Sequence, residues 1–142
     1  MKIAQLSFEE VKEVAHSLAQ KYMAWGEPIP NFSTRFPNVL ERCIEAPFQT
    51  FSGPLYKGLV EKSAILFYLM IKNHPFQNGN KRIAVITLLY FLSKNRHWLK
   101  VDNQRLYNFA KWVAESDASL KDATVSAVQK FISDNLVKIK GK

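Results

Sequence analysis

Two apolar runs separated by a short polar segment constrain the fold of this chain more than any other feature. Residues Ala64–Ile71 and Ile83–Leu92 are apolar on nearly every side, and between them lies the segment His74–Arg82, HPFQNGNKR. Its proline cannot continue a helix, because it lacks an N–H and clashes with the preceding turn. Its Asn-Gly-Asn cluster favours a tight turn and ends at Asn80, a good N-cap residue. The pattern predicts two buried helices, about Leu59–Asn73 and Lys81–Lys94, joined by a polar loop.

The exit of this loop has the chemistry of an anion site. Unpaired N–H groups at the start of a helix, together with the helix dipole, attract negative charge. Lys81 and Arg82 place two cations at the same end, where they oppose the dipole at a cost on the order of 0.3–1 kcal/mol each. An arrangement that costs stability favours a phosphate site. On these residues alone, a solvated turn between two helices is the alternative.

The segment HPFQNGNKR resembles the signature of the Fic/Doc family, His-x-Phe-x-(Asp/Glu)-(Gly/Ala)-Asn-(Gly/Lys)-Arg. The match covers His74, Phe76 and residues 79–82, and the flanking apolar helices extend the resemblance over roughly residues 45–115. Lys81 stands where adenylyl-transferring Fic enzymes carry a second glycine, and in this respect the chain is similar to the Doc (death-on-curing) branch. Val85 stands where many of those enzymes carry a second arginine, which also points away from adenylyl transfer.

The resemblance assigns a role to each residue of the motif. His74 would be the general base that accepts a proton from an attacking hydroxyl. The backbone around Gly79 and Asn80 would hold phosphate oxygens, with a further contact from the Asn80 side chain. Lys81 and Arg82 would neutralise the charge on a transferring phosphoryl group. The resemblance implies ATP, or another nucleoside triphosphate, with Mg²⁺.

Asn78 is the departure from the family pattern that matters most. The family usually has Asp or Glu here, which binds the Mg²⁺ that bridges the nucleotide phosphates. Asn78 offers only a neutral carbonyl oxygen, although Asn does serve as a Mg²⁺ ligand in protein kinases. Two interpretations follow: an enzyme with a weaker metal site at Asn78, or a catalytically disabled relative.

Length, cysteine content and hydropathy predict one domain, residues 1–142, in the cytoplasm. A chain of this size can bury about two-thirds of its unfolded surface, enough for a real core. The single cysteine, Cys43, excludes an internal disulfide, suits a reducing compartment and is expected to be a small buried residue. No basic-then-apolar leader is present, and Ile83–Leu92 is about half of the ~20 residues that a membrane span needs.

The formal net charge of +8 fits a phosphate-rich nucleotide or an acidic protein partner. The cations are spread along the chain and form no base-reading helix or aromatic-interleaved ribbon. Nucleic-acid binding is therefore the weaker interpretation. It predicts salt-dependent binding that survives the substitution His74→Ala.

The remaining elements predict an all-α, Fic-like bundle of about six helices. Ser7 and Glu10 form a capping box for a first helix, which places His16 on its polar face and ends near Gly26. A short helix follows at about Asn38–Glu45. Asn95 is expected to end the second central helix, and a connector at residues 96–101 is expected to close the core. Asp102 and Ser119 are expected to cap the last two helices.

Residues Phe48–Tyr56 are the one stretch where extended structure is plausible. The family has a small β-hairpin flap just before the motif-bearing helix pair. A flap holds its target by strand pairing. The resemblance therefore predicts a protein target bound at Thr50, Phe51, Ser52 and Gly53, whereas the residues alone slightly favour an ordinary loop.

Many Fic enzymes carry an inhibitory helix with the pattern (Ser/Thr)-x-x-x-Glu-(Gly/Asn). No glutamate of this chain is followed by Gly or Asn. The resemblance therefore implies restraint in trans, by an antitoxin whose acidic segment folds on the basic surface. The hypothesis is a Doc-like toxin that transfers a phosphoryl group to a hydroxyl of a target protein, by analogy a translation elongation factor. A Fic-type adenylyltransferase and a disabled Fic-like binding module are the alternatives.

Overall fold

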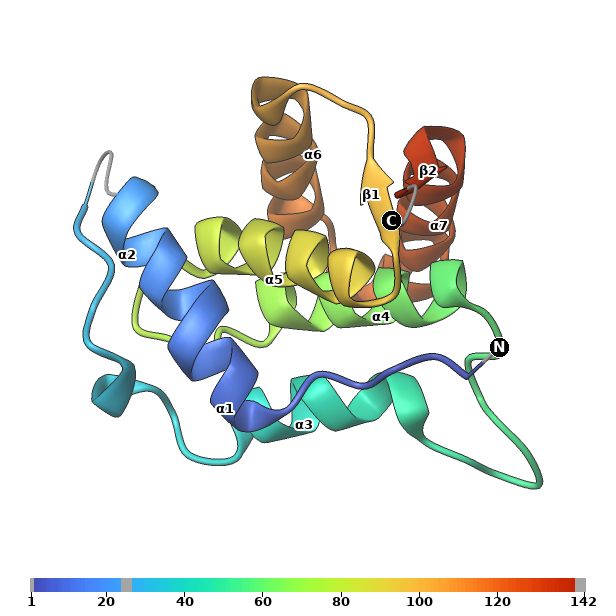
Figure 1. Cartoon of the computed structure of the whole chain (residues 1–142), viewed down its shortest axis with the longest axis horizontal. Coiled ribbons are helices and arrows are strands. Elements are labelled where there is room, and N and C mark those ends of the chain that lie inside the picture. Colours follow the sequence, from blue (N-terminus) through green and yellow to red (C-terminus); the bar gives the residue numbers. More distant parts are fainter. Residues whose placement is uncertain (1, 24–26, 140–142) are drawn as a thin grey trace.

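The computed structural model describes residues 2–23 and 27–139, which form an all-α bundle around two central helices (Figure 1). These are α4 (Leu59–Lys72) and α5 (Asn80–Lys94), which pack against each other along their length. Around them lie α1 (Phe8–Glu10), a π-helical segment (Val11–His16), α2 (Ser17–Tyr22), α3 (Val39–Glu45), α6 (Asn103–Glu115) and α7 (Lys121–Asn135). Two strands, β1 (His97–Leu99) and β2 (Leu136–Lys138), and 3₁₀ turns at Phe32–Thr34, Ala46–Phe48 and Ala118–Leu120 complete the described residues.

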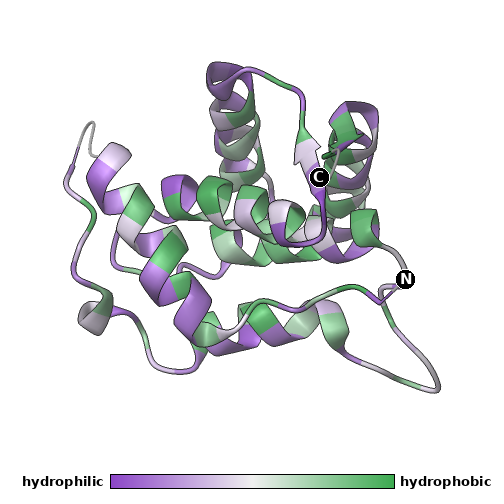
Figure 2. Cartoon of the chain, in the orientation of Figure 1, coloured by the Kyte–Doolittle hydropathy of each residue, from purple (hydrophilic) through white to green (hydrophobic). Residues whose placement is uncertain are grey.

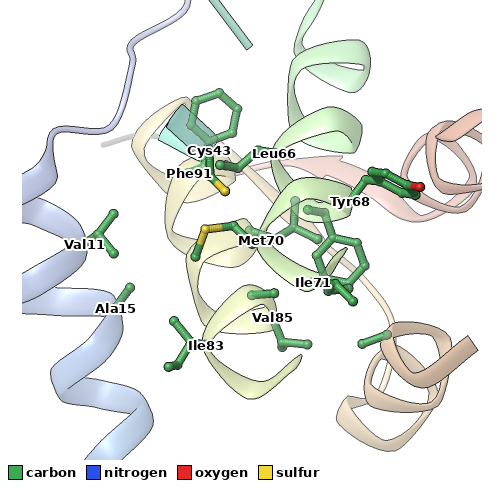
Figure 3. Packing of buried hydrophobic residues seen from close by; sticks show 14 of the residues in the cluster. Val11, Ala15, Cys43, Leu66, Tyr68, Met70, Ile71, Ile83, Val85 and Phe91 are labelled. Carbon is green, nitrogen blue, oxygen red and sulfur yellow. The ribbon is translucent and has the colours of Figure 1, made fainter. Parts of the chain in front are cut away.

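The central position of α4 and α5 follows from their apolar character on all sides. Figure 2 shows mixed hydrophilic and hydrophobic residues on the surrounding helices, which cover the core with one face only. In Figure 3, Val11 and Ala15 of the N-terminal helical segment (residues 8–22) face Met70 of α4 and Ile83 of α5. All four residues are fully buried. Burial of a large apolar side chain contributes about 1.5–3 kcal/mol. The predicted helical bundle is thereby confirmed: with residues 8–22 counted as one helix, the described residues form six helices.

The N-terminal helical segment begins as predicted and then departs from the α-helical period. The Ser7 hydroxyl accepts from the Glu10 N–H at 3.0 Å, and the Glu10 carboxylate accepts from the Ser7 N–H at 2.8 Å. Residues 11–16 are π-helical, which shifts the phase of the side chains relative to an α-helix. The predicted surface position of His16 is wrong for this reason: His16 is buried, and its Nε2 lies 2.9 Å from the Pro30 carbonyl oxygen. The predicted stop at Gly26 lies outside the described residues.

The predicted hairpin before α4 is present in a minimal form. One antiparallel β-bridge joins Thr50 to Pro54, and the Phe51 N–H donates to the Gly53 carbonyl at 2.7 Å. The buried Lys62 ammonium donates to the carbonyls of Pro47, at 3.1 Å, and of Tyr56, and thereby fixes the base of this loop.

The ends of the other helices largely follow the sequence signals. Asn95 ends α5, and the Asp102 carboxylate accepts from the Arg105 N–H at 2.8 Å at the start of α6. The prediction that Ser119 caps the last helix, α7 (Lys121–Asn135), is wrong. Ser119 lies in a 3₁₀ turn capped by Asp117, and α7 begins at Lys121.

The connector after α5 closes the core as predicted, but it does so as part of a sheet. β1 pairs with β2 in antiparallel register, with Trp98 opposite Val137. Leu99 is buried against the core, while Trp98 is exposed on the outer face. None of the helices among residues 2–23 and 27–139 combines the length and apolar character needed to cross a bilayer.

Candidate functional site

The motif loop begins with a histidine in an unusual backbone conformation. α4 ends at Lys72, Asn73 caps it, and His74 follows with φ of +49°. This is the left-handed region, which helices commonly enter just beyond their C-terminus and which glycine usually occupies. His74 is exposed. This conformation costs a residue with a Cβ about 1–2 kcal/mol.

Phe76 anchors the loop in the core, as predicted. Its side chain is 1 % exposed, and its ring centroid lies 5.3 Å from that of His16 and 5.9 Å from that of Phe32. A further link between the loop and the N-terminal third is the Phe36 N–H, which donates to the Pro75 carbonyl at 2.9 Å. The loop is therefore held by residues far away in the sequence.

Asn80 has a different structural role from the predicted one. The N-cap of α5 is Gly79, and Asn80 is the first helical residue. The Asn80 Oδ1 accepts from the Phe76 N–H at 2.9 Å, and its Nδ2 donates to the Phe76 carbonyl at 2.8 Å. This pair of bonds fixes the orientation of the amide, so the side chain clamps the loop instead of capping the helix.

The clamped amide also faces the histidine. Asn80 Nδ2 lies 3.4 Å from His74 Nδ1, a long contact. Because the amide nitrogen can only donate, we assign the lone pair of the neutral imidazole to Nδ1 in this arrangement. His74 therefore has one ring nitrogen that can accept a proton, held loosely beside the start of α5.

Gly79 brings the N-terminal segment close to the start of α5. Its φ is +75°, and a Cβ at this position would lie 3.0 Å from the Ile29 Cγ1 and 3.4 Å from the Arg82 Nη2. Both the backbone conformation and the space favour glycine here. Lys81 is half-buried on the first turn of α5.

Arg82 reaches back to the N-terminal segment. Its side chain is 6 % exposed, and its Nη1 donates to the Met23 carbonyl at 2.8 Å. The guanidinium is thus held at the N-terminal end of α5. A phosphate would be a stronger partner for this group.

Asn78 fits a ligand role toward a cation. Its Oδ1 is buried and has no hydrogen-bond partner among the described residues, while its Nδ2 donates to the Glu27 Oε2 at 3.3 Å. An unpaired carbonyl oxygen is the type of donor that Mg²⁺ accepts. The described residues contain no group of three or more His, Cys, Asp or Glu side chains that could hold a metal by themselves. Such a site would therefore be completed by phosphate oxygens and water.

A protein-family model described as the Fic/DOC family matches residues 5–92. The chain belongs to the Fic/DOC family. Searches of curated proteins and of solved structures returned no match. The matched region begins well before residue 45, where the resemblance was expected to begin, so it includes the N-terminal helical segment and ends within α5.

The structure gathers most of the predicted Fic/DOC residues and separates one group. His74, Asn78, Gly79, Asn80 and Arg82 lie together in the motif loop and the first turn of α5. The predicted flap residues 50–53 precede the opposite end of α4, a helix of 14 residues, which spans about 21 Å. Figure 1 shows the two loops at opposite ends of α4.

Sequence reasoning missed the N-terminal side of the Fic/DOC site. Met23, Glu27 and Ile29 contact Arg82, Asn78 and Gly79, respectively. The Met23 contact is made by its backbone carbonyl, which every residue type has, so the sequence cannot indicate it. For Glu27, the signal available was its place in a Glu-Pro segment directly after the first predicted helix.

Proposed function

We propose that this Fic/DOC protein is a Doc-like toxin that transfers a phosphoryl group from a nucleoside triphosphate to a hydroxyl of a target protein. The observation that carries the proposal is the set of groups at the start of α5. The exposed His74 imidazole, the clamped Asn80 amide and the buried Arg82 side chain lie there, and Lys81 precedes Arg82 in the first turn of the helix. Lys81, in place of a second glycine, supports phosphoryl over adenylyl transfer.

His74 acts as the proton acceptor in this proposal. The hydroxyl oxygen of the target forms a bond to the γ-phosphorus, the bond from that phosphorus to the β–γ bridging oxygen breaks, and a nucleoside diphosphate leaves. The hydroxyl proton passes to the unprotonated ring nitrogen of His74. The long contact from Asn80 is weak enough to be exchanged for the incoming hydroxyl.

The first turn of α5 binds the phosphates. N–H groups near Gly79 and Asn80 point toward an anion beyond the helix end, and the dipole favours negative charge there. Arg82 exchanges or shares its Met23 carbonyl partner with a phosphate oxygen, and Lys81 adds a second positive charge. A Mg²⁺ bound at Asn78 would neutralise phosphate charge during transfer.

The transfer reaction is tested with labelled nucleotide. The protein is incubated with cell lysate, Mg²⁺ and ATP labelled at either the α- or the γ-phosphate, and labelled proteins are separated on a gel. We expect label from the γ position only, and no label with His74→Ala. Label from the α position only would show adenylyl transfer instead.

A specific observation favours a second candidate, a catalytically disabled binding module. Asn78 replaces the usual acid, and Arg82 is already bonded to the Met23 carbonyl. This candidate predicts no label from either position, in the native chain or in Asn78→Asp. Restored transfer in Asn78→Asp alone would instead identify the metal ligand as the defect.

The proposed partners are a target protein and an antitoxin. A target that pairs with residues 50–53 while its hydroxyl reaches His74 would have to span the length of α4, about 21 Å. By analogy, the target is a translation elongation factor. Phe51 is 83 % exposed at the tip of this loop, and Phe51→Ala should weaken target labelling without changing nucleotide binding.

An apolar cleft close to Arg82 supports restraint by an antitoxin. Its volume is about 650 Å³, and it lies between the end of α2, the middle of α5 and the start of α6. Met23, Val85, Ile86 and Leu89 line it. The apolar face of an acidic antitoxin helix would fill this cleft and block the arginine. Ile86→Lys should then abolish neutralisation while leaving transfer intact.

A further inference from the structure

The motif of this chain lacks the carboxylate that would hold a divalent cation, and the fold brings one to the same place from a distant segment. Asn78 and Glu27 are 51 positions apart in the sequence. Glu27 follows the N-terminal helical segment and lies outside the motif. Its carboxylate oxygen is 3.3 Å from the Asn78 amide nitrogen.

The orientation of the Asn78 amide is consistent with its neighbours. With Nδ2 toward Glu27, a donor faces an acceptor. The reverse orientation would place Oδ1 against a negatively charged oxygen, which is repulsive. Oδ1 is left buried and without a hydrogen-bond partner among the described residues. A buried oxygen without a donor destabilises the fold, and a bound cation would remove this cost.

The segment that carries Glu27 is held over the motif turn by its next residues. Ile29 is 6 % exposed and would contact any Cβ at Gly79. The Ile29 carbonyl accepts from the Gln20 amide at 3.3 Å, and the Pro30 carbonyl lies 2.9 Å from His16 Nε2. Glu27 itself is exposed, so its carboxylate can turn while the backbone after it stays fixed.

We propose that Glu27 supplies the carboxylate of the divalent-cation site, with the Asn78 carbonyl oxygen as the second protein ligand. One carboxylate and one amide oxygen, completed by nucleotide phosphates and water, form an ordinary Mg²⁺ environment. Asn78 then needs no acid, because the negative charge comes from Glu27. The inference rests on the proposed nucleotide-binding function and explains how the chain performs it without the usual acidic residue of the motif.

The test measures nucleotide binding without relying on catalysis. The affinity for a non-hydrolysable ATP analogue is determined by isothermal titration calorimetry, once with Mg²⁺ and once with EDTA. The substitution Glu27→Gln removes the charge but keeps an oxygen that can accept from Asn78 Nδ2. With Mg²⁺, we expect Glu27→Gln to weaken binding about tenfold or more, as when one group of a metal site is lost. With EDTA, binding should be equal or tighter, because a carboxylate no longer repels the phosphates.

Two further variants separate the possible outcomes. Glu27→Gln combined with Asn78→Asp moves the charge back into the motif and should restore the Mg²⁺ dependence. Glu45→Gln changes an exposed glutamate of α3 and should have no effect. An unchanged Mg²⁺ dependence in Glu27→Gln overturns this inference but leaves the proposed function. If neither the native chain nor Asn78→Asp binds the analogue with or without Mg²⁺, the proposed function fails and the inference with it.

Discussion

Replacement of His74 by glycine is expected to stabilise the fold while it abolishes transfer. His74 follows the capped end of α4 with φ of +49°. A residue with a Cβ pays about 1–2 kcal/mol in the left-handed region, whereas glycine pays no such cost but loses about 0.5–1 kcal/mol more conformational entropy on folding. The imidazole is exposed and makes one long contact, with Asn80. The net gain should be about 0.5–1 kcal/mol, or a rise in Tm of about 1–4 °C.

Thermal unfolding followed by far-UV circular dichroism measures this gain. His74→Ala removes the same imidazole but keeps the Cβ, so the difference between the two variants isolates the backbone term. Arg96 is a matched control, because it has φ of +64° directly after Asn95 at the end of α5. Arg96→Gly should stabilise the chain similarly and leave transfer unchanged. A glycine variant at 74 that is less stable than the alanine variant would refute the argument.

Three other predictions concern stability and reactivity. Phe76→Ala should lower the free energy of unfolding by about 3–5 kcal/mol, because it empties the space between His16 and Phe32. Urea denaturation measures this loss. A loss below about 1 kcal/mol would contradict the role of Phe76 as an anchor. Burial lowers the pKa of His16 from its ordinary 6.5, so the unfolded chain binds more protons and stability should fall as pH drops below that value. The urea midpoint of His16→Gln should depend less on pH between pH ~5 and ~7 than that of the native chain. Burial raises the pKa of the Cys43 thiol to about 12. Ellman's reagent should therefore react with Cys43 only after the chain is unfolded in urea. Rapid reaction of the folded chain would show that Cys43 is accessible.

The sequence by itself determined the central helix pair and the loop between them. The causes are local: Pro75 ends one helix, the Asn-Gly-Asn turn reverses the chain, and apolar residues all round a helix can only be buried. Ser7 and Asp102 were likewise readable as caps, because a cap acts on a backbone N–H within three residues. Such contacts do not depend on the path of the rest of the chain.

Only the tertiary structure decided what completes the candidate site. Arg82 meets the Met23 carbonyl across 59 positions of sequence, and Asn78 meets Glu27 across 51. A π-helical turn moved His16 into the core, where an α-helical count places it outside. A single polar residue leaves no periodic signal, and its partner depends on how helices pack and where the chain returns. The motif therefore predicts where a phosphate could bind, whereas only the fold shows which distant groups surround it.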